Sequence, residues 1–153
     1  MGITPTIDMC ISGREITEPR PSPVSQTVMF LSRVSGEPTE FVEVGVDGVG
    51  EVVRPVDVPP ASGRGGNGGV WCWYSGDGAV VYIGTDGSLR LWPDRNAPLT
   101  TELASPGGAV ESPVAIADRD AVIVTSDRGS VWMVSVTEGR VERLDNGSHD
   151  FCA

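Results

Sequence analysis

Three short apolar runs recur along this chain at intervals that suit one repeated β-sheet unit. They lie at 28–31 (Val-Met-Phe-Leu), 80–83 (Val-Val-Tyr-Ile) and 122–125 (Val-Ile-Val-Thr). Successive runs are 52 and 42 residues apart, and each is followed by a turn and a second β-type run. Turn residues such as Asp-Gly pairs separate the runs, and no helical periodicity extends over ten residues. The pattern therefore indicates short antiparallel strands throughout.

A period of about 40–50 residues with about four strands per unit is typical of β-propeller blades. A closed ring needs about four to eight blades, and this chain holds about three. We predict an all-β fold, an incomplete β-propeller of about three blades built from antiparallel four-stranded sheets. The expected parts are a lead-in segment, three blades and the start of a connection to a missing blade, at 1–16, 17–59, 60–108, 109–147 and 148–153.

Charge and apolar content narrow the class of partner. The net charge is −10, with 11 basic against 21 acidic residues, so nucleic acid and anionic lipid are not expected partners. No run approaches the roughly 20 apolar residues that span a bilayer, and the N-terminus lacks the basic and apolar regions of a secretory signal. The three cysteines are far apart in the sequence and odd in number, which argues against a disulfide framework. We predict a cytoplasmic location without membrane association.

One turn-and-strand element carries a family resemblance. Residues 73–82, Trp-Tyr-Ser-Gly-Asp-Gly-Ala-Val-Val-Tyr, resemble the W-S-P-D-G repeat of TolB-like propellers, which also occurs in the N-terminal propellers of the prolyl oligopeptidase family of serine peptidases. In the first unit, 20–30 keeps Ser22 and Pro23, but Val24 and Ser25 replace the usual Asp-Gly. The third unit keeps only the strand pattern.

A glycine-rich segment adds a second resemblance. Residues 65–71, Gly-Gly-Asn-Gly-Gly-Val-Trp, are similar to the segment that opens the second blade in the dipeptidyl-aminopeptidase and acylaminoacyl-peptidase branch. That branch usually has Glu-Tyr just before the glycines, and 62–64 is Ser-Gly-Arg here. The role of those two residues is therefore not carried over. Together the resemblances cover about 14–147.

The resemblance implies a gating role in a serine peptidase, which is a hydrolase. In that family a propeller limits access of small peptides to an α/β-hydrolase domain that carries the Ser-Asp-His triad. The implied partners are the missing blades and hydrolase of the same polypeptide and the peptide substrates of this parent protein. No serine here lies in G-x-S-x-G, which a nucleophile elbow requires. We therefore assign no catalytic residue and no cofactor to this fragment.

The remaining chemically active residues have simpler interpretations. His149, Asp150 and Cys152 fall short of the four paired ligands of a closed zinc site, so no metal is predicted. Strand alternation places Cys72 on the face opposite Trp71 and Trp73, as a buried thiol. The four tryptophans, Trp71, Trp73, Trp92 and Trp132, are expected to fill space between blades.

The glycine-rich loop supplies the single binding hypothesis of the sequence. It lacks the lysine and Ser/Thr of a P-loop, and no helix follows it. We interpret it as an inter-blade loop near the central channel, with Arg64 and Asn67 as channel-loop contacts. Arg64 would there meet a peptide carboxylate.

Two alternatives remain open from the sequence. The chain could be a TolB-like or WD-like propeller that binds proteins, since 89–94 resembles the W-D end of a WD repeat. A WD repeat also carries Gly-His upstream, and the chain has no Gly-His. Alternatively, a three-unit protein could complete its ring by oligomerising, because open strand edges favour self-association.

Overall fold

The computed structural model describes residues 13–62, 68–116 and 118–145. Over these residues the chain forms β-strands and no helix, and hence no helix that could cross a bilayer. The strands are β1 (Arg14–Pro21), β2 (Thr27–Val34), β3 (Glu40–Gly45), β4 (Val52–Arg54), β5 (Trp71–Trp73), β6 (Val80–Ile83), β7 (Leu89–Trp92), β8 (Thr101–Glu102), β9 (Val110–Ala115), β10 (Ala121–Ser126), β11 (Val131–Ser135) and β12 (Val141–Arg143).

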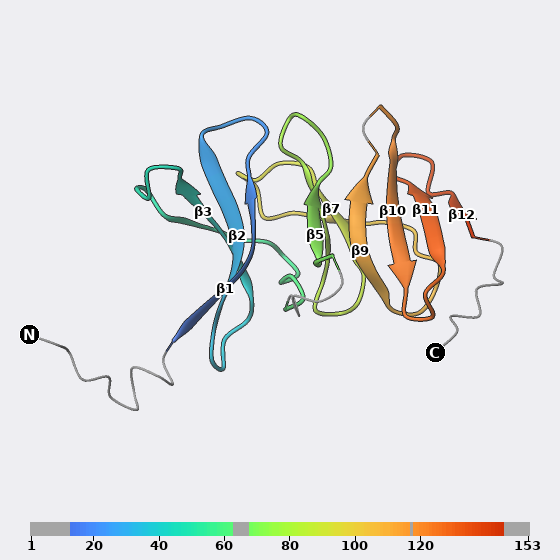
Figure 1. The fold of residues 1–153 in the computed structure, drawn as a ribbon, viewed down its shortest axis with the longest axis horizontal. Helices are drawn as coiled ribbons and strands as arrows, with labels where there is room; N and C mark the ends of the chain where they lie inside the picture. The colour runs from blue at the N-terminus through green and yellow to red at the C-terminus, as the bar shows by residue number, and fades with distance from the viewer. Residues whose placement is uncertain (1–12, 63–67, 117, 146–153) are drawn as a thin grey trace, which may run out of the picture.

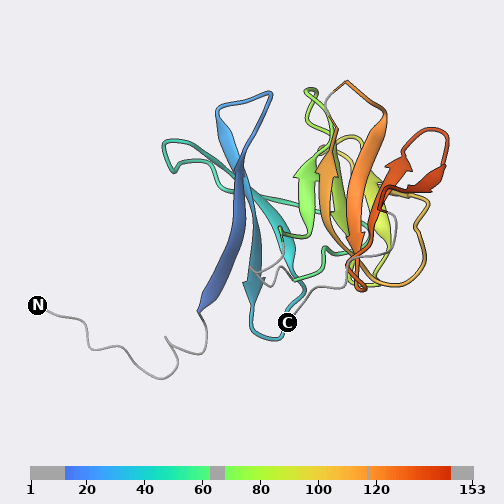
Figure 2. The same ribbon diagram turned by 45° about the vertical axis from the view of Figure 1, so that its right-hand side comes forward.

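Consecutive strands pair into three antiparallel four-stranded sheets, β1–β4, β5–β8 and β9–β12. Figures 1 and 2 show the sheets side by side along the long axis of the molecule, with the first sheet at one end and the third at the other. Strand β5 of the second sheet contacts β9 of the third. The predicted fold class is confirmed: the chain is all-β and forms three propeller-like blades that do not close a ring.

The first strand differs from the expected pattern. It begins at Arg14, inside the segment expected as a lead-in, and it includes Pro19 and Pro21. Its pairing with β2 shifts between Thr17 and Arg20, and Glu18 has a φ of 52°. Proline is tolerated here because β1 is an edge strand and one of the prolines lies in an irregular stretch. Pro19 and Pro21 therefore belong to the strand.

The third unit also has an earlier inner strand than its sequence indicates. The pattern predicts an inner strand at 114–117, whereas β9 spans Val110–Ala115 and includes Pro113. In the second unit the outer strand β8 is reduced to two residues. Edge strands contribute few apolar residues to the core, so their sequence signal is weaker than that of β6 or β10.

Apolar side chains fill the two spaces between neighbouring sheets. The cluster between the first and second blades consists of Met29, Leu31, Phe41, Trp71, Val80, Tyr82 and Trp92. The cluster between the second and third blades consists of Cys72, Val81, Ile83, Leu89, Leu103, Val110, Val122, Val124 and Val134. Because side chains alternate along a strand, β5 and β6 supply both clusters. The predicted placement of Trp71 and Cys72 on opposite faces is confirmed.

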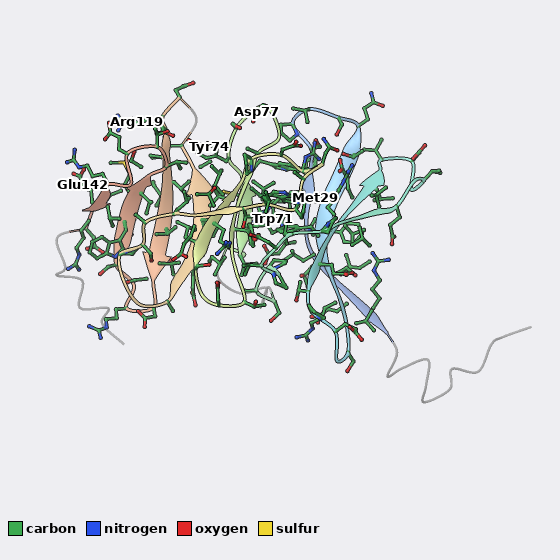
Figure 3. The ribbon with its side chains drawn as sticks, turned by 180° about the vertical axis from the view of Figure 1, so that it is seen from behind. Met29, Trp71, Tyr74, Asp77, Arg119 and Glu142 are labelled. Carbon is green, nitrogen blue, oxygen red and sulfur yellow. The ribbon has the colours of Figure 1, made fainter. Side chains whose placement is uncertain are left out.

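Phe41 lies at the centre of the first inter-blade cluster. Its ring is 5.7 Å from the Trp71 ring, nearly perpendicular to it, and 5.4 Å from the rings of Tyr82 and Trp92. Phe41, Trp71 and Trp92 are fully buried, and Figure 3 shows Trp71 beside Met29 of the first blade. The expectation that tryptophans fill space between blades is confirmed for Trp71 and Trp92. Such aromatic pairs add to the free energy of apolar burial.

We expect Phe41→Ala to lower the free energy of unfolding by about 3–5 kcal/mol, because it leaves a cavity among three aromatic rings. Urea denaturation followed by tryptophan fluorescence measures this loss. Leu99→Ala is the matched control, since Leu99 is 71% exposed and should change stability by less than about 0.5 kcal/mol. Equal effects of the two variants would contradict the central position of Phe41.

Candidate functional site

An open cavity of about 690 Å³ lies where loops of all three blades meet. We call it the three-blade pocket. Its lining residues are Pro23, Trp73, Tyr74, Ser75, Gly76, Ala115, Ile116, Asp118, Arg119 and Asp120. Figure 3 shows Tyr74, Asp77 and Arg119 at the same end of the sheets. Small-molecule sites typically have about this volume and combine aromatic rings with a few polar groups.

A tight turn after β5 positions Tyr74 in this pocket. The Asp77 carboxylate accepts a hydrogen bond from the Ala79 amide at 3.2 Å, and the Tyr74 amide donates to the Ala79 carbonyl at 2.8 Å. Gly78 has a φ of 92°, and a side chain there would lie 3.1 Å from Val24 of the first blade. Glycine is therefore required both by the turn and by the close approach of two blades. This turn is the Ser-Gly-Asp-Gly part of the motif at 73–82.

The Tyr74 hydroxyl donates a hydrogen bond to Asp120 of the third blade. The second oxygen of Asp120 accepts from the Thr137 amide at 2.9 Å. Burial, together with the hydrogen bond to Asp120 and the charge of that carboxylate, raises the pKa of Tyr74 to about 12. The hydrogen bonds from Tyr74 and Thr137 lower the pKa of Asp120. Tyr74 therefore remains a neutral donor at physiological pH and joins the second blade to the third.

Two charged side chains that line the pocket, Asp118 and Arg119, have no side-chain partner among the described residues. Both side chains are exposed, and within the described residues neither forms a hydrogen bond or an ion pair. Asp118 has a φ of 68°, which is uncommon for a residue with a side chain. The Trp73 indole nitrogen is also buried without a partner in the described part of the chain. A carboxylate and a guanidinium are thus available beside two aromatic rings.

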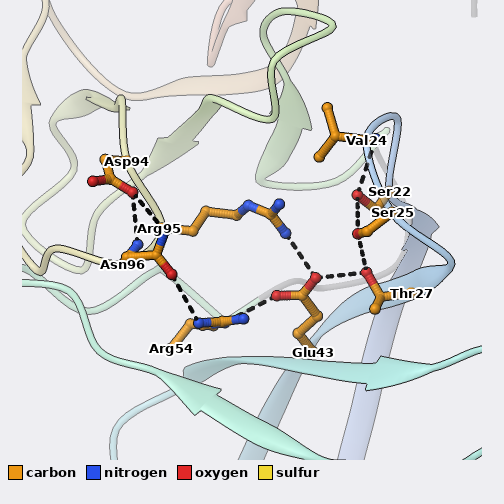
Figure 4. Close-up of polar contacts among 9 residues, drawn as sticks. All are labelled: Ser22, Val24, Ser25, Thr27, Glu43, Arg54, Asp94, Arg95 and Asn96. Atoms are coloured by element: carbon orange, nitrogen blue, oxygen red, sulfur yellow. Dashed lines mark hydrogen bonds and ion pairs between the residues drawn. The ribbon is translucent and has the colours of Figure 1, made fainter.

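Near this pocket, Glu43 holds the first blade to the second. Its carboxylate accepts hydrogen bonds from Thr27 at 2.5 Å, Arg54 at 2.9 Å and Arg95 at 2.8 Å (Figure 4). The Arg95 guanidinium also lies 5.1 Å from the centre of the Trp73 ring. Burial alone would raise the pKa of Glu43, but the hydrogen bond from Thr27 and the charges of Arg95 and Arg54 outweigh it, so this pKa is lowered.

Glu18 makes a second polar contact between the same two blades. Both of its carboxylate oxygens accept from the Val70 amide, at 3.1 and 2.9 Å. A side chain at Gly69 would approach a Glu18 oxygen to 2.3 Å, so the glycine leaves room for the Glu18 carboxylate against the second blade. Arg20 lies 3.7 Å from Glu18 and stacks over the Trp71 ring at 5.1 Å. The end of the glycine-rich segment therefore contributes to blade packing.

The structure does not describe the site residues that the sequence predicts. Arg64 and Asn67, the expected channel-loop contacts, lie outside the described residues, as do His149, Asp150 and Cys152. Burial raises the pKa of the Cys72 thiol to about 11, in agreement with a structural cysteine. No cluster of ligating side chains that could hold a metal occurs in 13–62, 68–116 or 118–145.

The pocket residues were missed by sequence reasoning. The sequence pattern indicates only a turn at 118–120, and it places Tyr74 in the turn-and-strand motif at 73–82. The signal that could have found them is an acidic pair in the turn of one blade beside an aromatic residue at the matching place in the previous blade. Such groups bind a ligand by charge and stacking. Comparison with protein-family models and with curated protein sequences finds no match to this chain.

We expect Glu43→Gln to lower the free energy of unfolding by about 3 kcal/mol, because it leaves Arg54 and Arg95 without their buried counter-charge. Glu40→Gln on the same strand is the control, since Glu40 is exposed and should have little effect. Denaturation curves measure both variants. Equal losses would contradict the role of Glu43.

The same contact predicts a pH dependence. The pKa of Glu43 is lower in the folded state than its ordinary value of 4.5. Its contribution is therefore fully present above about pH 4.5 and is lost as the pH falls through the lowered folded pKa. Glu43→Gln should flatten the acid side of a stability profile measured from pH 7 to pH 2.

Proposed function

We propose that this chain is the non-catalytic propeller portion of a serine peptidase of the prolyl oligopeptidase family. In this proposal it limits the access of small peptides to an α/β-hydrolase domain elsewhere in the same polypeptide. The main support is the motif at 73–82, which forms the turn between β5 and β6, where Asp77 accepts from the Ala79 amide and Gly78 has a positive φ. Two of the residues that carry the resemblance, Asp77 and Gly78, are thus ones that the turn requires physically.

The position of the turn also supports the proposal. It carries Tyr74 into a pocket lined by loops of all three blades, at one end of the sheets (Figure 3). A propeller that admits peptides must present polar and aromatic groups where its blades converge. The described blades offer such groups in the three-blade pocket.

The test of this proposal uses the whole gene product. The coding frame should continue past Ala153 through further blades into a hydrolase with G-x-S-x-G followed by Asp and His. A fluorophosphonate probe should label that full-length protein at the serine and leave the 153-residue chain unlabelled. A frame that stops at Ala153, or a continuation without such a hydrolase, would contradict the peptidase proposal.

A second candidate is a protein-binding propeller completed by self-association. The observation that favours it is apolar exposure on the outward faces of the two end sheets. By register, Ile16, Val34 and Val53 lie on the face of the first sheet opposite Phe41, and they are 55%, 41% and 47% exposed. Val114, 55% exposed, lies on the outward face of the third sheet. Two copies would supply six blades, within the range of closed rings.

Sedimentation velocity of the 153-residue chain tests this second candidate. We expect a dimer that dissociates when Val53→Asp places a charge on the outward face of the first sheet. Glu102→Gln, a change on an exposed outer strand, should leave the dimer intact. A monomer at millimolar concentration would contradict self-completion of the ring.

A further inference from the structure

The three-blade pocket contains a carboxylate that takes no part in blade packing. The Asp118 carboxylate is exposed and has no side-chain partner among the described residues. Tyr74 presents a partly buried ring in the same cavity, while its hydroxyl is already bonded to Asp120. The pocket therefore offers an aromatic surface beside a free negative charge.

Elsewhere in this chain, an aromatic ring and a carboxylate together hold the guanidinium group of an arginine side chain. Four arginines each lie over an aromatic ring and also pair with a carboxylate. They are Arg14 on Phe30 with Glu51, Arg20 on Trp71 with Glu18, Arg95 on Trp73 with Glu43, and Arg143 on Trp132 with Asp145. The ring centres lie 5.1–5.8 Å from the guanidinium carbons. A planar guanidinium suits this arrangement because it stacks on the ring and donates hydrogen bonds sideways to the acid.

In the three-blade pocket the ring and the acid are present, and none of the described arginines lies over Tyr74. We propose that this pocket binds the guanidinium group of an arginine side chain carried by a peptide. The guanidinium would stack on Tyr74 and pair with Asp118. Arg119, which lines the same pocket, would oppose this binding by charge repulsion.

The volume of the pocket favours a peptide over a small ion, and the net charge of the chain favours a cationic ligand. The cavity measures about 690 Å³ and reaches from Pro23 of the first blade to Ile116 of the third, so it has room for residues beside the arginine. The chain carries a net charge of −10, which attracts a cationic ligand at low ionic strength. The inference concerns binding by this chain alone and holds whether or not a hydrolase follows it.

The test titrates the 153-residue chain with N-acetyl-Gly-Arg-Gly-amide and follows tryptophan fluorescence and NMR shifts. The matched probe replaces arginine by citrulline, which has nearly the same shape and no charge. We expect saturable binding of the arginine peptide, at least about tenfold tighter than the citrulline peptide, in line with a charge-assisted hydrogen bond. Equal binding of the two peptides, or no binding at low salt, would overturn the proposal.

Methylguanidinium alone distinguishes a peptide from a free guanidinium compound. We expect it to bind more weakly than the arginine peptide, because it leaves most of the cavity empty. An affinity equal to that of the peptide would overturn the peptide part of the inference.

Variants of the pocket give effects of opposite sign. Asp118→Asn should weaken the arginine peptide about tenfold, whereas Arg119→Gln should tighten it about twofold at low salt by removing a like charge. An anionic ligand would reverse both signs, and such a reversal would overturn the proposal. The control for Asp118→Asn is Glu102→Gln, which also removes one negative charge but from the exposed strand β8. It should change the affinity little.

Two changes at Tyr74 separate stacking from folding. Tyr74→Phe removes the hydrogen bond to Asp120 but keeps the ring, so it should lower stability by about 1 kcal/mol and retain peptide binding. Tyr74→Leu removes the ring and should abolish measurable binding in a chain whose circular dichroism remains that of a β-protein. Retained binding in folded Tyr74→Leu would contradict stacking on this ring.

Discussion

The structure depends on apolar packing between neighbouring sheets, and Phe41 lies fully buried among three aromatic rings of the first inter-blade cluster. A four-stranded sheet of this size cannot bury a core by itself, so each blade is stabilised by the face of the next. The second blade satisfies this requirement on both sides, because alternate residues of β5 and β6 point to opposite clusters. The first and third blades each have one neighbour, and apolar residues remain exposed on their outward faces.

Polar contacts fix how the packed blades are oriented. Glu43 and Glu18 of the first blade accept hydrogen bonds from the second, and Tyr74 of the second donates to Asp120 of the third. One aromatic residue, Trp73, belongs both to the contacts between blades and to the lining of the pocket. Trp73 supports Arg95 on the packing side and lines the three-blade pocket. A ligand in this pocket would therefore contact a residue that also packs the blades together.

Much of the fold could be predicted, because its signals are local. The apolar run at 80–83 became β6, and the glycine-containing turn at 75–78 became the turn before it. Alternation placed Trp71 and Cys72 correctly. The start of β1 at Arg14 was missed because its prolines indicate a break, and only pairing with β2 across an irregular register makes them part of a strand.

The sequence by itself determined the repeated strands, their turns and the faces on which apolar residues lie, since these follow from contacts between residues close along the chain. Only the tertiary structure decided that Tyr74 meets Asp120, 46 residues away, and that Glu18 meets Val70, 52 residues away. The reason is geometric. The spacing of residues along the chain does not determine the distance between residues of different blades. The packing of whole sheets brings Tyr74, Asp118 and Arg119 together in one pocket.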